Sequence, residues 1–472
     1  MSRKIKRRIP KKGRDIVKIP KIIKKGIKKI ENTESFVIQN KENMIIRKYK
    51  RELSRTRNSA SYRVGNAIIS SIIKPWNLLF LPFSLITLSW QLVSEKMGMA
   101  SPPVNESVFE EEGVKRNSIV FFPTNGVGFG HFTRLLSIAR RINKLDPAIE
   151  LVFFTTMPTL HILKEQGEFT AYHMPGRKGY KEEIDATAWN KITEEFLSNV
   201  FEIHRPNMFI FDGVFPYRGM LNAIRPRKMQ KIWVRRGTFK KNSSKIPLES
   251  LNYFDTIIRP ADGIDSEADD EYNPDIITCD PIRLLDLEEL ENRDDVLRQL
   301  GIPADSLVVY VQLGAGNINN IDSEIGMTVN ALLNNENIYV VLGESMLGKR
   351  MSLKNERMRV IRDYPNSRFF NSFDFAIMAA GYNSFHEAIS FSLPTIFYPN
   401  MNTGKDDQYA RAKVAEDAGA MVVIKNRKEN TIAAAIERLC DPNVRERMRK
   451  NSKKLQRDNG AEQLAKYIID KL

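Results

Sequence analysis

The segment "AAGYNSFHEAI" at residues 379–389 places small residues and a carboxylate where a helix is expected to begin. Gly381, Asn383 and Ser384 can cap this helix and leave backbone N–H groups for a phosphate. Glu387 lies about one turn further on, and its two carboxylate oxygens can accept hydrogen bonds from two vicinal hydroxyls. A ribose attached to a diphosphate presents both features at that separation. The alternative is that Glu387 only complements the helix dipole.

A polar loop follows at 399–413, "PNMNTGKDDQYARAK", and runs into another expected helix. Asp407 and Gln408 combine a carboxylate, which only accepts hydrogen bonds, with an amide that both donates and accepts them. This combination suits the hydroxyls of a sugar. A solvated start of the helix is the alternative.

A glycine loop at "FFPTNGVGFGHFTRLL" separates an expected strand from an expected helix. Gly126, Gly128 and Gly130 stand where a dinucleotide-binding fold holds pyrophosphate. The third glycine of G-x-G-x-x-G is replaced by His131, and no acidic ribose ligand follows the second strand, which disfavours a nicotinamide enzyme. The glycines still permit close approach of a ligand, and His131 at the helix mouth points into the same space. A structural histidine is the alternative.

Further candidates lie at the ends of other expected strands. Gly314 and Gly316 form a second glycine turn in "VQLGAGNIN", although such turns also serve only to pack a helix on a sheet. Asp212 ends "FIFDG" and is a candidate to orient His131. Arg235 and Arg236 follow "KIWV", where they face either an acceptor phosphate or only the surface. Both arginines are therefore candidates for the acceptor side of the site.

Alternating apolar runs and helical patterns predict the elements that position these residues. Two series of strands and helices in succession imply two doubly wound α/β domains, at 117–285 and 286–472. The last helix either stays with the second domain or returns to the first. The expected strands are 118–124, 150–154, 208–213 and 231–236 in the first series, and 307–314, 338–343, 375–380, 394–400 and 420–425 in the second.

The positive charge of the 472-residue chain, +16 overall, is confined to its beginning. Residues 1–64 carry 22 Lys and Arg against 5 Asp and Glu, and the remainder carries 51 against 52. Within this basic tail, "KIPKIIKKGIKKI" at 18–30 places isoleucines on one helical face and lysines opposite. That pattern favours an anionic membrane surface as partner. A solvated tail and a nucleic-acid-binding arm are the alternatives, and the second is disfavoured because nucleic acid requires no apolar stripe.

An uncharged stretch follows at 75–94, "PWNLLFLPFSLITLSWQLVS", bracketed by Trp76 and Trp90. Its length is sufficient for a membrane span. A single span would place the basic tail and the main body on opposite sides, against the positive-inside rule if the body is cytosolic. We therefore expect residues 65–97 to re-enter the membrane or to lie in its plane, with a buried core element as the alternative. Residues 98–116 are predicted to be a linker.

Cys279 and Cys440 are the only cysteines, which suits a reducing compartment and provides no cysteine metal site. No D-x-D occurs in the chain, and no cleavable signal peptide is apparent. We therefore expect no metal, no cofactor and a cytoplasmic location at the membrane face.

Residues 381–411 resemble the nucleotide-sugar-binding region of GT-B glycosyltransferases. They are most similar to glycosyltransferase family 28, which includes a lipid-linked N-acetylglucosaminyltransferase. "GVGFGH" and "LGAGN" resemble the two glycine loops of that family. The resemblance covers residues 117–472 as architecture, and residues 1–116 lie outside it. It implies two Rossmann-like domains facing a cleft, the first for the acceptor and the second for the nucleotide sugar.

The resemblance also implies roles for individual residues. Glu387 would bind the ribose and His131 would be the general base or contact the acceptor. The acceptor-side glycines would be those of the first loop. The remaining donor-side residues would be Gly314, Gly316, Gly381, Asn383 and Ser384 near the diphosphate, and Asp407 and Gln408 at the donor sugar.

The leading hypothesis is a metal-independent, inverting transferase that moves a hexosyl or N-acetylhexosaminyl group from a UDP-sugar. Its acceptor would be a lipid-linked saccharide or a cell-surface polysaccharide. One alternative is a nucleotide-sugar epimerase of similar build, which needs no second substrate. The other is a non-enzymatic sugar-binding protein that uses its tail to bind membrane or nucleic acid.

Overall fold

The computed structural model describes residues 49, 52–53, 56–96, 117–124, 128–158, 160–235, 248–264, 276–314, 322–346, 355–403 and 406–472. The basic helix expected at 18–30 and the linker expected at 98–116 lie outside the described residues. The chain divides into two compact units near Leu92, one with the N-terminal helices and one with the α/β elements.

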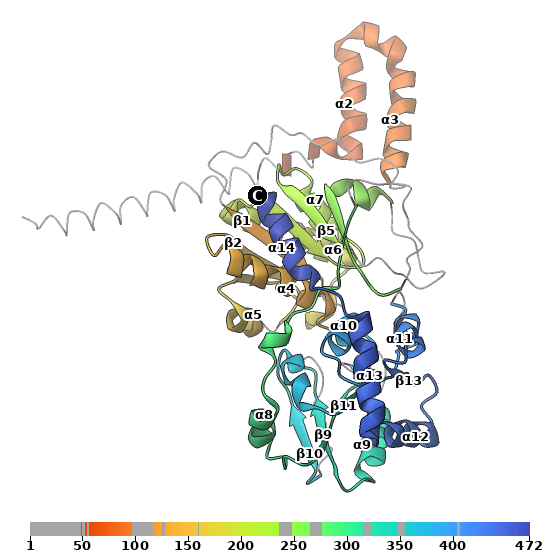
Figure 1. Ribbon diagram of the computed structural model, residues 1–472. Helices are drawn as coiled ribbons and strands as arrows, with labels where there is room; N and C mark the ends of the chain where they lie inside the picture. The colour runs from red at the N-terminus through yellow and green to blue at the C-terminus, as the bar shows by residue number, and fades with distance from the viewer. Residues whose placement is uncertain are drawn as a thin grey trace, which may run out of the picture. The chain divides into compact units, whose positions relative to one another are not determined.

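The apolar segment forms a helical hairpin, with α2 (Ala60–Ile73), the 3₁₀ turn η1 (Pro75–Phe80) and α3 (Leu81–Lys96) (Figure 1). The two helices run side by side, and Arg63 Nη2 donates a hydrogen bond of 3.2 Å to Gln91 Oε1. By length and composition the stretch Trp76–Glu95 is able to cross a membrane, and none of it is buried. The structure gives no support to the buried-core alternative. Large apolar side chains are exposed at Ile68, Ile69, Ile72, Ile73, Trp76, Leu78, Leu79, Phe80, Phe83, Ile86, Trp90 and Val93.

The first α/β domain contains a parallel sheet in the order β3-β2-β1-β4-β5-β6-β7. Its strands are β1 (Ser118–Pro123), β2 (Glu150–Thr155), β3 (Thr170–His173), β4 (Met208–Asp212), β5 (Gln230–Val234), β6 (Thr256–Pro260) and β7 (Ile276–Cys279). Its helices are α4 (Gly130–Leu145), α5 (His161–Gln166), α6 (Ala186–His204) and α7 (Arg218–Ile224), with 3₁₀ turns η3 (Arg177–Gly179) and η4 (Leu248–Tyr253).

The second domain contains a parallel sheet in the order β10-β9-β8-β11-β12-β13. Its strands are β8 (Leu307–Gln312), β9 (Ile338–Gly343), β10 (Met358–Ile361), β11 (Phe375–Met378), β12 (Thr395–Phe397) and β13 (Val422–Val423). Its helices are α8 (Arg293–Leu300), α9 (Asp322–Leu333), α10 (Tyr382–Ser390), α11 (Gln408–Asp417), α12 (Glu429–Cys440) and α13 (Pro442–Leu455), with 3₁₀ turns η5 (Leu287–Glu289) and η6 (Asn366–Ser372).

The central strands are apolar on both faces because helices cover both sides of each sheet. In β1, Ile119 and Phe121 pack with α4, α5 and the last helix, α14 (Gly460–Asp470), whereas Val120 and Phe122 pack with α6 and α7 on the opposite face. In β8 the side chains alternate in the same way between α8, α10 and α11 on one side and α9 and α12 on the other.

Parallel register places the candidate residues at one edge of each sheet. Pro123 at the end of β1 is paired with Asp212 at the end of β4, so the loop that leads to His131 begins beside Asp212. In the second sheet Gln312 is paired with Met378, so the turn at Gly314 begins beside the loop that precedes α10. Both loops thus leave the carboxyl ends of the strands, where open α/β sheets bind ligands.

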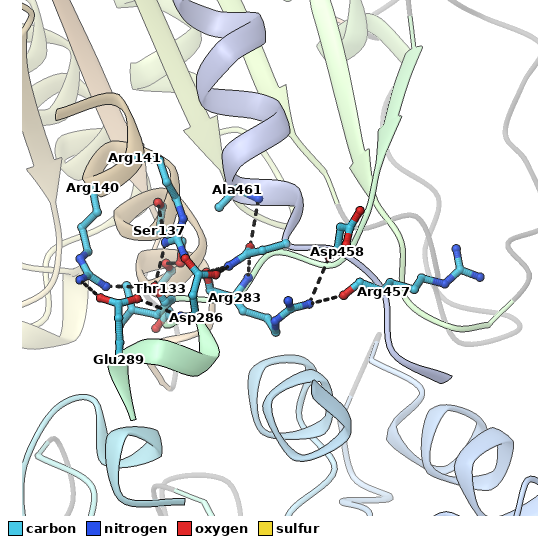
Figure 2. Close-up of polar contacts among 12 residues, drawn as sticks. Thr133, Ser137, Arg140, Arg141, Arg283, Asp286, Glu289, Arg457, Asp458 and Ala461 are labelled. Carbon is cyan, nitrogen blue, oxygen red and sulfur yellow. Dashed lines mark hydrogen bonds and ion pairs between the residues drawn. The ribbon is translucent and has the colours of Figure 1, made fainter. Parts of the chain in front are cut away.

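The chain passes between the two sheets twice, before η5 and after α13, and then α14 packs on α4 of the first domain (Figures 1 and 2). Asn459 joins the two crossings. Its Oδ1 accepts from the backbone N–H of Arg283, and its Nδ2 donates to Arg283 O and to Asp286 Oδ1 at 3.1 and 2.7 Å. Gly460 follows because a Cβ there would lie 2.0 Å from Asp280 O.

Candidate active site

A cavity of about 610 Å³ is lined by residues of both α/β domains. The first domain contributes the residues around the start of α4 and Val214 after β4, and the second contributes the segments that follow β8, β9, β10, β11 and β12. Gly314 has a backbone φ of +106°, a conformation that favours glycine, and apart from its two chain neighbours no residue comes within 4 Å of where its Cβ would be. The backbone at this turn is therefore open to a ligand.

On the first-domain side, His131 lines the cavity in the first turn of α4. Its Nδ1 lies 2.6 Å from Oδ1 of Asp212, whose side chain has no exposed surface. An ionised carboxylate only accepts hydrogen bonds, so Asp212 accepts one from His131 when the ring proton is on Nδ1. Nε2 is then the basic nitrogen, as in a general base oriented by a carboxylate.

Arg134 lies one turn along the same helix and completes the environment of Asp212. Its Nε donates to Oδ2 at 2.9 Å and its Nη2 to Oδ1 at 2.6 Å, which is the bidentate geometry of a strong pair. Burial alone would raise the pKa of the Asp212 carboxyl, but Arg134 and His131 outweigh burial and hold that pKa below its ordinary value. Asp212 is therefore ionised at neutral pH.

On the second-domain side, α10 begins at Tyr382 with Gly381 as its N-cap. No side chain caps this end, so Asn383 and Ser384 occupy the first turn without capping it, which corrects that expectation. All four residues from Gly381 to Ser384 line the cavity. The free N–H groups and the positive end of the helix dipole suit an anion such as a diphosphate.

Glu387 lines the same cavity one turn further along α10. Ser367 Oγ donates a hydrogen bond of 2.9 Å to its Oε1. Burial raises the pKa of the Glu387 carboxyl to about 7, more than the hydrogen bond from Ser367 and the charge of Arg283 lower it. A ligand that donates hydrogen bonds to this carboxylate would favour its ionised form.

Tyr382 connects α10 to the first domain. Its hydroxyl donates to Ala261 O at 3.2 Å and accepts from the backbone N–H of Ile282 at 3.1 Å. Beside it, Asp262 of the first domain receives Arg411 of α11 through Nε and Nη2 at 2.6 and 2.7 Å, with both side chains buried. These contacts place the start of α10 next to the His131–Asp212 pair.

The structure brings together most of the residues singled out in the sequence. His131, Gly128, Gly130, Gly314, Gly381, Asn383, Ser384, Glu387 and Gln408 all line the cavity. Asp212 does not line the cavity itself but contacts His131, which does. Gly126, Gly316 and Arg236 lie outside the described residues.

Two predicted contacts are not where the sequence placed them. Asp407 does not line the cavity, because its Oδ1 caps α11 by accepting from the N–H of Ala410 at 2.9 Å. The adjacent Asp406 lines the cavity instead. Arg235 is buried, with its guanidinium 5.6 Å from the ring centre of Trp233, so it faces neither the cavity nor the solvent.

Other site residues were missed. Arg134 follows His131 by three positions on a helix, a spacing that places both on one face and could have identified it. Tyr364 stacks on Phe129 at 5.0 Å between ring centres and shares a hydrogen bond of 2.8 Å with Thr133. No local pattern marks Tyr364, because its partners lie more than 200 residues away in the chain. Within the described part of the chain, no group of three His, Cys, Asp or Glu side chains is placed to hold a metal ion.

The raised pKa of Glu387 yields a prediction on stability. A carboxyl group whose pKa in the folded protein is about 7 destabilises the fold when it is ionised. The loss of stability appears as the pH rises from about 4.5 through 7. Glu387→Gln should therefore raise the unfolding temperature relative to wild type at pH 8 and have little effect at pH 4.5, by differential scanning fluorimetry.

Glu344→Gln is the matched control. Glu344 lines the same cavity, but its Oε2 lies 3.4 Å from Arg362 Nη1, so removing its charge leaves an arginine without that partner's charge and brings no gain. An unfolding temperature of Glu387→Gln that stays equal to wild type at every pH would contradict the burial argument.

Comparison with known proteins agrees with this geometry. Residues 355–464 match the C-terminal domain of glycosyltransferase family 28. A relative from Acetivibrio thermocellus is 23% identical over 362 residues, covering 72% of this chain and 95% of its own. That relative is a UDP-N-acetylglucosamine–N-acetylmuramyl-(pentapeptide) pyrophosphoryl-undecaprenol N-acetylglucosamine transferase.

Solved structures show the same fold. The glycotransferase of kitacinnamycin superposes with a TM-score of 0.53 at 15% identity, covering 75% of this chain and 99% of that one. The calicheamicin glycosyltransferase CalG4 gives 0.51 at 15% identity, covering 76% and 99%. The proteins named here are all transferases, so the epimerase alternative has no support. The chain is a glycosyltransferase of the GT-B fold, and its C-terminal domain is similar to that of family 28.

Proposed function

We propose that the protein transfers a hexosyl or N-acetylhexosaminyl group from a UDP-sugar to a hydroxyl of a lipid-linked saccharide, with inversion and without a metal. The observation that carries the proposal is that one cavity is lined both by His131, oriented by Asp212, and by the start of α10 with Glu387. The donor and acceptor named for the Acetivibrio thermocellus relative support the choice of substrates.

The donor is bound through α10. The diphosphate lies at the N–H groups of Gly381 to Ser384, beside the open turn at Gly314. The two oxygens of Glu387 accept hydrogen bonds from the ribose hydroxyls, and Ser367 holds the carboxylate in place. At the donor sugar, Gln408 contributes its side chain.

The reaction is a single displacement. His131 Nε2 accepts the proton of the acceptor hydroxyl, whose oxygen attacks the anomeric carbon from the side opposite the leaving group. The bond from that carbon to the diphosphate oxygen breaks, and UDP leaves with the electron pair. The N-terminal dipole of α10 stabilises the charge that develops on the diphosphate, so no metal is needed in this scheme.

The helical hairpin supports an acceptor that resides in a membrane. α2 has 14 residues and α3 has 16, so at about 1.5 Å per residue each helix is shorter than the roughly 30 Å hydrocarbon core of a bilayer. Because the two helices return the chain to its starting side, the hairpin embeds in one leaflet without crossing. The protein then sits at the cytosolic face, with the basic tail of residues 1–64 on the same side. No comparable observation favours a free polysaccharide or a nucleic acid as partner.

Donor binding should depend on pH through Glu387. Between pH 8 and pH 6 the ionised fraction of a carboxyl with a pKa of about 7 falls about tenfold, and the affinity for a UDP-sugar should fall by a similar factor. Glu387→Gln should bind more weakly at pH 8 and show no such dependence. Isothermal titration calorimetry measures the affinity of wild type and of the variant at each pH. The ligand is an intact UDP-sugar, because free UDP itself titrates near pH 6.

A panel of UDP-, GDP- and TDP-sugars tested by thermal stabilisation selects the nucleotide for that titration, since ligand binding to the native state raises its stability. Preference for a GDP- or TDP-sugar, or wild-type affinity in folded Glu387→Gln, would contradict the donor assignment.

Removal of the proposed base should slow the chemistry. His131→Ala should lower turnover by about 10²–10⁴-fold with little change in donor affinity, because the ring acts on the acceptor hydroxyl. Steady-state kinetics with a lipid-linked acceptor measure the first quantity and calorimetry the second. Near wild-type turnover in this variant would exclude His131 as the base.

Membrane attachment should depend on the apolar surface of the hairpin. Replacing Trp76, Leu79 and Phe80 with Glu should release the full-length protein from anionic vesicles at high salt, where charge contributes little. Leu145→Glu is the control, since Leu145 is an exposed apolar residue on α4. The account fails if the triple variant stays bound in flotation assays, or if protease digestion shows the tail and the body on opposite sides.

A further inference from the structure

We propose that Arg134 is a positioning residue that keeps His131 neutral. Its guanidinium offsets the charge of Asp212, so that the carboxylate can orient the ring without causing it to be protonated. The inference rests on the proposed function, in which His131 is the general base. It assigns a role to a side chain that the proposed chemistry does not otherwise use.

The arrangement poses a conflict that a general base has to resolve. A carboxylate 2.6 Å from Nδ1 fixes the ring and its tautomer, but it also favours the imidazolium form. The pair is partly shielded from water, with 18% of the His131 side chain exposed and none of Asp212, so the attraction is weakly screened. An imidazolium has no lone pair with which to accept the proton of an acceptor hydroxyl.

Arg134 lies close enough to the ring to oppose this effect of the carboxylate. Its Nη2 lies 2.8 Å from His131 Nδ1, so the positive charge of the guanidinium opposes the addition of a second proton to the ring. The two contacts have similar lengths, so the guanidinium opposes the effect of the carboxylate on the protonation of His131.

The geometry holds Arg134 at this place. Two hydrogen bonds to Asp212 fix the plane of the guanidinium, and only 2% of the side chain is exposed. On its other side the Tyr382 ring centre lies 5.1 Å from Arg134 Cζ. Arg134 thus lies between the Asp212 carboxylate and Tyr382, the first residue of α10.

Other titratable groups also lie on the buried side of the His131–Asp212 pair. Burial raises the pKa of the Tyr382 hydroxyl above its ordinary value and that of the Cys279 thiol to about 12, so both are neutral at pH 7. Asp262 is ionised, but it is held by the two hydrogen bonds from Arg411.

The carboxylates that line the cavity have their own partners. Glu387 accepts from Ser367. The other three face arginines, in the pairs Glu344 with Arg362 at 3.4 Å, Asp363 with Arg368 at 2.6 Å and Asp406 with Arg411 at 2.7 Å. Among the described residues, Arg134 is the cation that contacts both His131 and Asp212.

The test follows the titration of His131 in the full-length protein by NMR of ¹³C-labelled histidine. The chain has five histidines, and the signal of His131 is the one lost in His131→Gln. Arg134→Met should move the titration midpoint up by at least about one pH unit, because the carboxylate then acts unopposed. Asp212→Asn should move it down, since the guanidinium then acts unopposed. Arg134→Met/Asp212→Asn should return it to within about half a unit of wild type.

Two further variants separate charge from packing. Arg134→Lys keeps the charge and should shift the midpoint less than half as far as Arg134→Met does. Arg140→Met is the matched control on α4, because Arg140 bonds Leu284 O and Glu289 at the domain crossing (Figure 2), and it should leave the midpoint unchanged. The acid limb of the kcat/KM profile should move with the NMR midpoint in every variant that retains turnover.

An unmoved midpoint in folded Arg134→Met would overturn the inference. If that variant does not fold, the comparison of Asp212→Asn with the double variant decides, and equal midpoints in those two would overturn it. The proposed function is tested separately. Near wild-type turnover in His131→Ala would exclude His131 as the general base. The NMR midpoints would still report whether Arg134 sets the protonation of the ring.

Discussion

An ionised Asp212 with no exposed surface is the constraint on which the site depends. Removing a carboxylate from water costs several kcal/mol unless it is paired and hydrogen-bonded. Here Arg134 and His131 supply the pairing, and both lie in the first turns of α4. The strand that ends at Asp212 and the strand that leads to α4 must therefore be adjacent, as their register makes them. The order of the central strands therefore brings Asp212 next to the residues of α4 that pair with it.

A second buried carboxylate joins the two domains in the same manner. Asp262 follows β6 of the first sheet, and the arginine that pairs with it, Arg411, comes from the second domain. Tyr382 lies close to both buried pairs, with ring-to-guanidinium distances of 5.1 Å to Arg134 and 5.9 Å to Arg411. The helix proposed to hold the diphosphate thus begins at the contact between the domains. Its position relative to His131 is set by buried ionic groups, which tolerate little displacement.

The sequence predicts the apolar central strands and the residues that follow them. β1, β2, β4 and β8 were visible as continuous apolar runs, and parallel strands necessarily bring His131 and Asp212 to one edge. Of the four edge strands, β13 was predicted at 420–425, whereas β3, β7 and β10 were not. β3 is "TAYH" and no residue in it is fully buried, so no apolar run marks it. β7 is the short strand "IITC", in which only Cys279 is buried, and it follows a polar, acidic stretch of the chain.

Individual side chains were harder to place than strands. Asp406 and Asp407 are adjacent acids at a helix start, and only the local backbone decides that Asp407 caps the helix while Asp406 faces the cavity. Arg235 follows a strand that is covered on both faces, so its side chain packs on Trp233 and not in a site. The apolar segment at 75–94 is uncharged throughout, and composition alone did not reveal the turn that makes it part of a hairpin.

The central claim is that one cavity binds a nucleotide sugar and activates an acceptor. The most direct measurement is the release of UDP by the purified full-length protein, supplied with a UDP-sugar in vesicles with and without a lipid-linked saccharide. The account predicts UDP release that requires the acceptor, with one equivalent of glycosylated lipid formed for each UDP. Conversion of the donor to an isomeric sugar nucleotide without any acceptor, or binding of the donor with no UDP released in its presence, would contradict it.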